Sequence, residues 1–249
     1  MSGHSKWSSI KHKKGAADAK RGKLFTKLTR AIIVAAKEGG PDPASNLALQ
    51  NAIEKARSYS MPKDNIERAI AKGTGEGSDA DALETVLYEG YGPGGVALLV
   101  EALTDNRNRT GSEVRHLFSK HGGNLGEPGS VAYLFDKRGV VVVDGSRYGE
   151  DDLLPAIEAG ALDVTVDDDV FEVLTEPSDL TAVRAALEEA GVELESAEVV
   201  QYPKTRVPLD EEIAGRLLRL IDALEDNDDV GEVHGNFDVD AEVLERVAG

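Results

Sequence analysis

Residues 20–37, KRGKLFTKLTRAIIVAAK, determine how the N-terminal part of this chain folds. With a rotation of about 100° per residue, the apolar side chains of this segment fall on one broad arc of a helical wheel. They are Leu24, Phe25, Leu28, Ala31, Ile32, Ile33 and Ala35. The basic side chains fall together on the opposite arc, and they are Lys20, Lys23, Lys27, Arg30 and Lys37. The segment therefore predicts an amphipathic helix with a basic outer stripe, which Gly39-Gly40-Pro41 ends.

Two shorter helices are predicted after this one. The first runs from about Pro43 to Tyr59, and Met61-Pro62 breaks it. The second covers residues 65–72, because Asp64 and Glu67 have the spacing of a capping box, and the glycines from Gly73 onward stop it. Three helices with short links indicate a small α-helical domain. Residues 1–16 show no apolar period, so we interpret them as an arm that is flexible or ordered by a partner.

The pattern changes to strands after Gly77. Residues 85–91 and 96–103 are predicted strands joined by a glycine-rich turn, and a helix opened by a capping box at Thr110 leads to a strand at 130–135. Residues 139–202 then follow the order strand, helix, strand, strand, helix, strand, which is typical of a ferredoxin-like unit. A helix at 210–224 and a strand at 230–239 follow.

Together these elements predict an α+β fold, with an N-terminal α-helical domain followed by two α/β (ferredoxin-like) domains, one inserted in the other. The unit at 81–134 lacks a helix and a strand, which the C-terminal helix and strand could supply. The expected domains are residues 1–78, residues 79–134 plus 204–249, and the inserted residues 135–203.

Charge is distributed very unevenly along the chain. Residues 1–40 hold ten basic and two acidic side chains, a net charge of +8, in a protein whose net charge is −18. Residues 41–75 add +1, so residues 76–249 carry −27. A basic end of this kind attracts polyanions, whereas the acidic remainder repels them.

Several classes of protein are disfavoured by composition. There is no cysteine, so disulfides and thiolate metal sites are excluded. The apolar runs are far shorter than the roughly 18 residues that a membrane helix needs. No secretory signal is recognisable, so we expect a cytoplasmic protein without a membrane partner, although a basic N-terminus also leaves an organelle-targeting segment open.

No arrangement typical of an enzyme is found. Gly90, Gly92 and Gly95 satisfy G-x-G-x-x-G, but a strand follows them, which favours a hairpin turn over a dinucleotide site. His116 and His121 point to different helix faces and do not predict a metal pair. Asp167-Asp168-Asp169 is interpreted as an exposed turn rather than a cation site. We therefore expect no catalytic residue, no metal, no cofactor and no small-molecule substrate.

Nucleic acid is the partner that the basic segment favours, because its cations can neutralise phosphates and release counterions. A solvated helix face is the alternative. The candidate binding residues of this segment are Lys6, Trp7, Lys11, His12, Lys13, Lys14, Lys20, Arg21, Lys23, Lys27 and Arg30. Trp7 could stack on a base or pack into the helical domain. No recognisable DNA-reading motif is present, so backbone contacts are favoured over sequence reading.

A second candidate is the donor-rich loop at residues 104–110, at the start of a predicted helix. Arg107, Asn108 and Arg109 could bind an anion there. Alternatively, the two arginines pair with nearby carboxylates.

Several long motifs resemble one known family. They are Gly3-His4-Ser5-Lys6-Trp7, Ile10-Lys11-His12-Lys13, Asp18-Ala19-Lys20-Arg21-Gly22-Lys23, Phe25-Thr26-Lys27, the run Met61–Ile70, Leu103–Thr110 and Gly122-Gly123-Asn124-Leu125-Gly126. These resemble the YebC/PmpR family, which also includes the mitochondrial translational activator of cytochrome oxidase.

The resemblance implies a three-domain protein without enzymatic activity. Members are usually described as DNA-binding transcriptional regulators, and some as ribosome-associated factors that help translation through proline runs. We therefore expect a non-enzymatic nucleic-acid-binding regulator of gene expression, most simply a DNA-binding transcriptional regulator. The alternative is a translation factor that binds ribosomal RNA on the ribosome. Phosphate contacts look alike in DNA and RNA, so the sequence does not separate the two.

Overall fold

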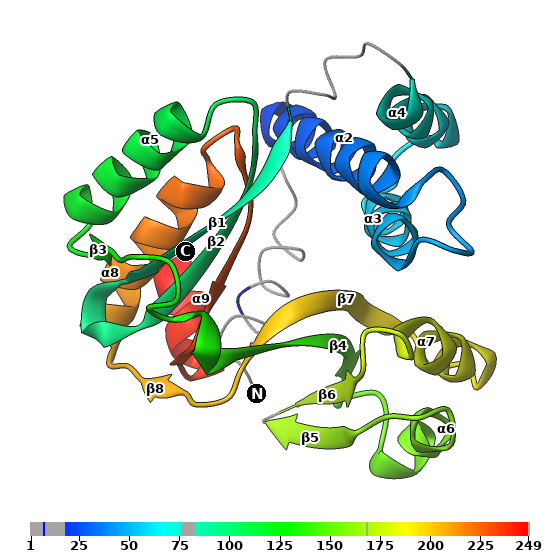
Figure 1. The fold of residues 1–249 in the computed structure, drawn as a ribbon. Helices are drawn as coiled ribbons and strands as arrows, with labels where there is room; N and C mark the ends of the chain where they lie inside the picture. The colour runs from blue at the N-terminus through cyan, green and yellow to red at the C-terminus, as the bar shows by residue number, and fades with distance from the viewer. Residues whose placement is uncertain (1–6, 8–17, 76–82, 168, 249) are drawn as a thin grey trace. The chain divides into compact units, whose positions relative to one another are not determined.

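The computed structural model describes residue 7 and residues 18–75, 83–167 and 169–248. Within these, the chain forms two compact units, each built from segments far apart in the sequence (Figure 1). One unit comprises residues 18–132 and 212–233. The other includes residues 133–211 and 234–248. The division into three domains that the sequence suggested stays a prediction.

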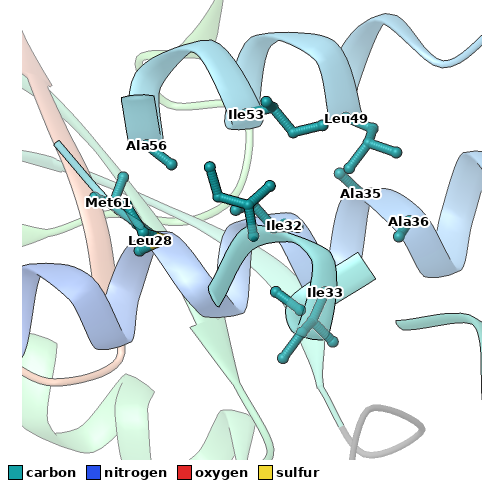
Figure 2. Close-up of a cluster of buried hydrophobic side chains, with 11 residues drawn as sticks. Leu28, Ile32, Ile33, Ala35, Ala36, Leu49, Ile53, Ala56 and Met61 are labelled. Atoms are coloured by element: carbon teal, nitrogen blue, oxygen red, sulfur yellow. The ribbon is translucent and has the colours of Figure 1, made fainter. Parts of the chain in front are cut away.

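Three helices form a small α-helical bundle in the first unit. They are α2 (Asp18–Gly39), α3 (Leu47–Ser58) and α4 (Lys63–Thr74). Their shared core contains most of the predicted apolar arc of α2. Figure 2 shows Leu28 next to Met61 and Ile32 pointing toward Ile53 and Ala56 of α3, whereas Ile33 points away from α3. Because Ile32 and Leu49 are both fully buried, this small bundle has a hydrophobic core from which solvent is excluded.

The bundle is tied together at two close contacts. Asn46 caps α3 by accepting from the Leu49 N–H at 3.0 Å, and its amide donates to the Ala35 carbonyl of α2 at 2.7 Å. At Gly73, a side chain would collide with the Ile33 carbonyl, so glycine lets α4 approach the α2 backbone. Gly73 was predicted to stop the helix; it instead lies within α4, where it serves this packing.

The first unit also holds a four-stranded sheet of order β3-β1-β2-β9, with two helices. Its elements are β1 (Glu84–Tyr91), the 3₁₀ turn η2 (Pro93–Gly95), β2 (Ala97–Thr104), α5 (Arg107–Lys120), β3 (Asn124–Leu125), α8 (Glu211–Glu225) and β9 (Val230–Gly235). The first two strands form the expected antiparallel hairpin, in register from Glu84 opposite Thr104. Gly94 and Gly95 have positive φ in its turn, which fits the hairpin interpretation of the glycine motif.

The second unit contains a four-stranded antiparallel sheet of order β5-β6-β4-β7. Its elements are β4 (Phe135–Asp144), the 3₁₀ turn η4 (Glu150–Leu153), α6 (Leu154–Glu158), β5 (Asp163–Asp167), β6 (Val170–Thr175), α7 (Leu180–Glu189) and β7 (Leu194–Pro203). This is the ferredoxin-like arrangement, with α6 and α7 packed on the sheet through a core that includes Val141, Val173 and Leu187. The predicted α+β fold class is therefore confirmed.

Short elements complete the second unit. They are the 3₁₀ turn η3 (Ala132–Leu134), which straddles the unit boundary, β8 (Val207–Pro208), β10 (Phe237–Asp238) and α9 (Ala241–Ala248). The last two were not predicted as separate elements. Strands β8 and β10 pair in parallel over two residues each. The strand predicted at 130–135 is wrong, because this segment forms the η3 turn and the third strand of the first sheet lies earlier, at Asn124–Leu125.

Both predicted capping boxes are also wrong. Helix α4 begins at Lys63 after Pro62, without a side-chain cap, and α5 begins at Arg107, three residues before Thr110. Asn106 caps α5 by accepting from the Arg109 N–H at 3.1 Å. In α5, a single side-chain cap from Asn106 therefore takes the place of the predicted capping box at Thr110.

Candidate nucleic-acid interface

The described part of the basic stripe on α2 contacts an acidic turn that follows α8. We call residues 225–229 the acidic turn; they are Glu225, Asp226, Asn227, Asp228 and Asp229. Lys23 Nζ lies 3.4 Å from Asp228 Oδ1 and 3.3 Å from the Asp226 carbonyl. Lys27 Nζ donates to the Glu225 carbonyl. The acidic turn thus presents carboxylate and carbonyl oxygens to the cations of the stripe. A phosphate backbone would likewise present negatively charged oxygens to them.

These contacts differ in strength along the stripe. Lys23 and Asp228 are exposed, with 55% and 72% of their side-chain surface accessible, so their attraction is well screened. Lys27 is half-buried, and burial lowers the pKa of its ammonium although Glu225, Asp228 and Asp226 act to raise it. Lys23 is therefore the lysine of the stripe that a competing anion can bind most easily.

Asp229 joins three elements of the first unit. Its Oδ1 accepts from Arg30 Nη1 of α2 at 3.1 Å, while Oδ2 accepts from Arg109 at 2.7 Å and from the Thr110 hydroxyl at 2.7 Å. Burial alone would raise the pKa of this carboxyl, but the hydrogen bonds from Arg109 and Thr110 and the charges of Arg109 and Arg30 hold the pKa below its usual value. Asp229 is therefore an ionised structural hub, only 7% exposed at its side chain.

The two arginines of the 104–110 loop have different surroundings. Arg109 pairs with Asp229 and with Asp105, at 2.9 Å from the latter. This is the carboxylate pairing that the sequence left open. Arg107 is exposed and reaches Glu84 only at 3.8 Å, and neighbouring Asn108 is exposed as well. The outward-facing pair Arg107 and Asn108 is thus the part of this loop still presented to a ligand.

The structure describes few of the remaining predicted residues. Lys6, Lys11, His12, Lys13 and Lys14 lie outside the described residues, and only the backbone is described for Lys20 and Arg21. Trp7 is buried, with 5% of its surface exposed, so its ring is not presented for stacking on a base. The acidic turn was missed by the sequence reasoning, although four carboxylates within residues 225–229 are a visible signal.

Other kinds of site are little supported. A hollow of about 460 Å³ in the second unit is lined by apolar side chains together with Glu150, Asp151 and Asp163, without a hydroxyl or imidazole. Over the described ranges, the acidic and histidine side chains form no group of three suited to a metal ion. The helices that the structure describes include none with the length and apolar character to cross a bilayer.

Comparison with known proteins shows the same family over nearly the whole chain. The sequence model of the TACO1/YebC protein N-terminal domain matches residues 5–76, and that of the TACO1/YebC second and third domain matches residues 83–237. A probable transcriptional regulatory protein of Rubrobacter xylanophilus is 60% identical over 250 residues, with 100% of both chains covered. A protein of the same description from Desulfotalea psychrophila is 55% identical over 250 residues, again covering 100% of both.

One solved structure has a similar fold. The crystal structure of a conserved hypothetical protein from Aquifex aeolicus matches with a TM-score of 0.77 and 50% identity, over 90% of this chain and 92% of that one. The motifs of the N-terminal segment, the α+β architecture and these matches agree, and the chain belongs to the TACO1/YebC family.

Proposed function

We propose that this protein regulates gene expression by binding DNA, chiefly through its basic N-terminal segment, residues 1–40, and that it catalyses no reaction. The observation that carries this is the charge separation, +8 in residues 1–40 against −18 for the whole chain. Relatives covering the full length share the description of probable transcriptional regulatory protein, which supports a role in transcription.

Binding proceeds by exchange of anions at the basic segment. Each phosphate that takes a lysine or arginine releases counterions into solution, which favours binding at low salt. On α2, phosphates compete with the acidic turn for Lys23 and Lys27. The exposed Lys23–Asp228 pair is worth only about 0–1 kcal/mol, so phosphates can replace it.

The acidic remainder of the chain limits where nucleic acid can lie. Residues 76–249 carry −27, which repels a phosphate backbone from most of that surface. Nucleic acid is therefore held chiefly by the basic segment, and most of the acidic part stays available for other partners.

The experiment neutralises cations of the basic segment that lie outside the described residues. In the full-length protein, Lys6, Lys11, Lys13 and Lys14 are replaced by Gln, and binding to a labelled DNA duplex is followed by fluorescence anisotropy across a salt series. Four lost phosphate contacts lower the slope of log K against log salt by about 3.6. The control replaces Lys137, Arg147, Arg184 and Lys204, all in the acidic second unit, by Gln, which gives the same change in net charge.

The outcomes separate the alternatives. The proposal requires a reduced slope in the N-terminal variant and an unchanged one in the control. Equal slopes in both would show that the basic segment does not contact the duplex. A ribosomal RNA competitor that displaces the duplex far below the concentration needed by unlabelled DNA would assign the segment to RNA instead.

A further inference from the structure

Carboxylates are abundant in this protein, and many of its described cations have one as a partner. The chain has 46 acidic and 28 basic residues. Ion pairs are found at Arg30, Lys55, Arg109, Arg138, Arg147, Lys204 and Arg246, among others. Lys120, Arg216 and Arg219 belong to a smaller group, with Arg57, Arg68, Arg115 and Lys137, for which no ion pair to a carboxylate is found among residues 18–75, 83–167 and 169–248. Lys120, Arg216 and Arg219 are all exposed.

These unpaired cations converge from two helices. Lys120 ends α5, and Arg216 and Arg219 lie one turn apart on the exposed face of α8, whose opposite face is buried through Leu217 and Leu220. Arg216 Nη2 lies 3.0 Å from where a Cβ at Gly122 would stand, so its guanidinium sits over the turn that ends α5. Figure 1 shows α5 and α8 on the same side of the β3-β1-β2-β9 sheet.

His121 is part of the same positive cluster. Burial lowers the pKa of its imidazole, and the charges of Lys120 and Arg219 lower the pKa further. Lys120 and Arg219 therefore lie close enough to His121 to affect its pKa. The imidazole ring offers an N–H donor beside these two cations.

A structural role explains only part of this cluster. Lys120 is favourable at the negative end of the α5 dipole, but Arg216 and Arg219 lie in the middle of α8, where the dipole gives no such benefit. Gathering like charges opposes folding. Their convergence from two helices, rather than the lack of an ion pair alone, makes these cations suited to holding an anion.

We propose that Lys120, His121, Arg216 and Arg219 form a second phosphate-binding surface that holds the backbone of the nucleic acid bound by residues 1–40. This inference rests on the proposed function and extends it to a site on the α/β part of the first unit. Arg216 and Arg219 can each grip a phosphate with two hydrogen bonds, while Lys120 adds a point charge. The contacts are to phosphates, so the surface positions the duplex without reading its sequence.

The test replaces the two arginines in the full-length protein. Arg216→Gln with Arg219→Gln lowers the salt slope for a labelled DNA duplex by about 1.8, which corresponds to roughly 10- to 30-fold weaker binding at about 150 mM salt. The control, Arg147→Gln with Arg184→Gln, makes the same change of charge in the second unit and leaves the slope unchanged. Arg216→Lys with Arg219→Lys keeps the slope but weakens binding, because lysine cannot bind in the bidentate mode.

Each outcome is decisive. The melting temperature of the Gln variant stays the same or rises, since like charges are removed, so weaker binding is not explained by unfolding. A wild-type slope in the Gln variant, or an equal loss in the control, overturns the second surface while leaving the proposed function standing. A wild-type protein that fails to bind the duplex overturns both.

Discussion

Removing carboxylates from the acidic turn is expected to tighten nucleic-acid binding. The perturbation is Asp226→Asn with Asp228→Asn, which deletes two negative charges facing the α2 stripe and keeps the backbone carbonyls that accept from Lys23 and Arg30. Since both substitutions are on exposed side chains, the fold should lose less than about 0.5 kcal/mol of stability.

The size of the effect follows from the exposure of the pairs. Lys23 and Asp228 are 3.4 Å apart but more than half exposed, so their pair is worth about 0–1 kcal/mol. Asp226 adds a second attraction of the same order on Lys27. Exposed pairs typically contribute about 0.2–1 kcal/mol each, so phosphates that no longer displace these two carboxylates gain about 0.4–2 kcal/mol and affinity rises by about 2- to 30-fold. The gain shrinks at high salt because the charges are exposed.

The assay is fluorescence anisotropy with a labelled DNA duplex at low and high salt. The matched control is Asp151→Asn with Glu158→Gln, two exposed acids of the second unit, which changes net charge equally. Unchanged affinity in the acidic-turn variant would refute competition between this turn and phosphate. The same gain in the control would attribute the effect to net charge alone.

Three further predictions concern charged side chains whose hydrogen bonds join separate segments of the first unit. Asp229→Asn lowers the free energy of unfolding by about 2–3 kcal/mol in urea denaturation; because the folded pKa of Asp229 is depressed, this difference is present above pH 3.8 and disappears as pH falls through the folded pKa. Glu89 accepts backbone N–H bonds from residues 129, 131 and 132, which hold its pKa below the usual value although burial raises it; Glu89→Gln costs about 2 kcal/mol above pH 4.5, and a pH-independent loss would contradict this reasoning. Arg109→Gln lowers the melting temperature clearly more than Arg107→Gln, because Arg109 holds Asp229 and Arg107 is nearly unpaired; equal shifts in calorimetry would refute that assignment.

Much of the fold follows from local patterns in the sequence. The apolar arc of residues 24–35 predicted the buried face of α2, since helical periodicity depends only on neighbours within a few turns. The strand and helix order of residues 139–202 likewise predicted the ferredoxin-like sheet. Helix starts were less predictable, because Asn106 at α5 and Pro62 at α4 took the cap positions in place of Thr110 and Asp64.

The partners of the charged residues could not be predicted in the same way. The basic stripe of α2 was recognised, but its contact with residues 225–229 joins segments far apart in the sequence, which no local pattern encodes. The cations of α5 and α8 gave even less signal, because Lys120 and the two arginines stand in unremarkable surroundings until the fold brings them together. Long-range charge pairing is set by the tertiary structure.

The central claim is that nucleic acid binds at the basic N-terminal segment. The most direct test cross-links the full-length protein to a photoreactive DNA duplex and locates the attached nucleotides by mass spectrometry of the digested chain. We expect cross-links within residues 1–40, with additional ones near Arg216 and Arg219. Cross-links confined to the acidic residues 135–203 would contradict the account.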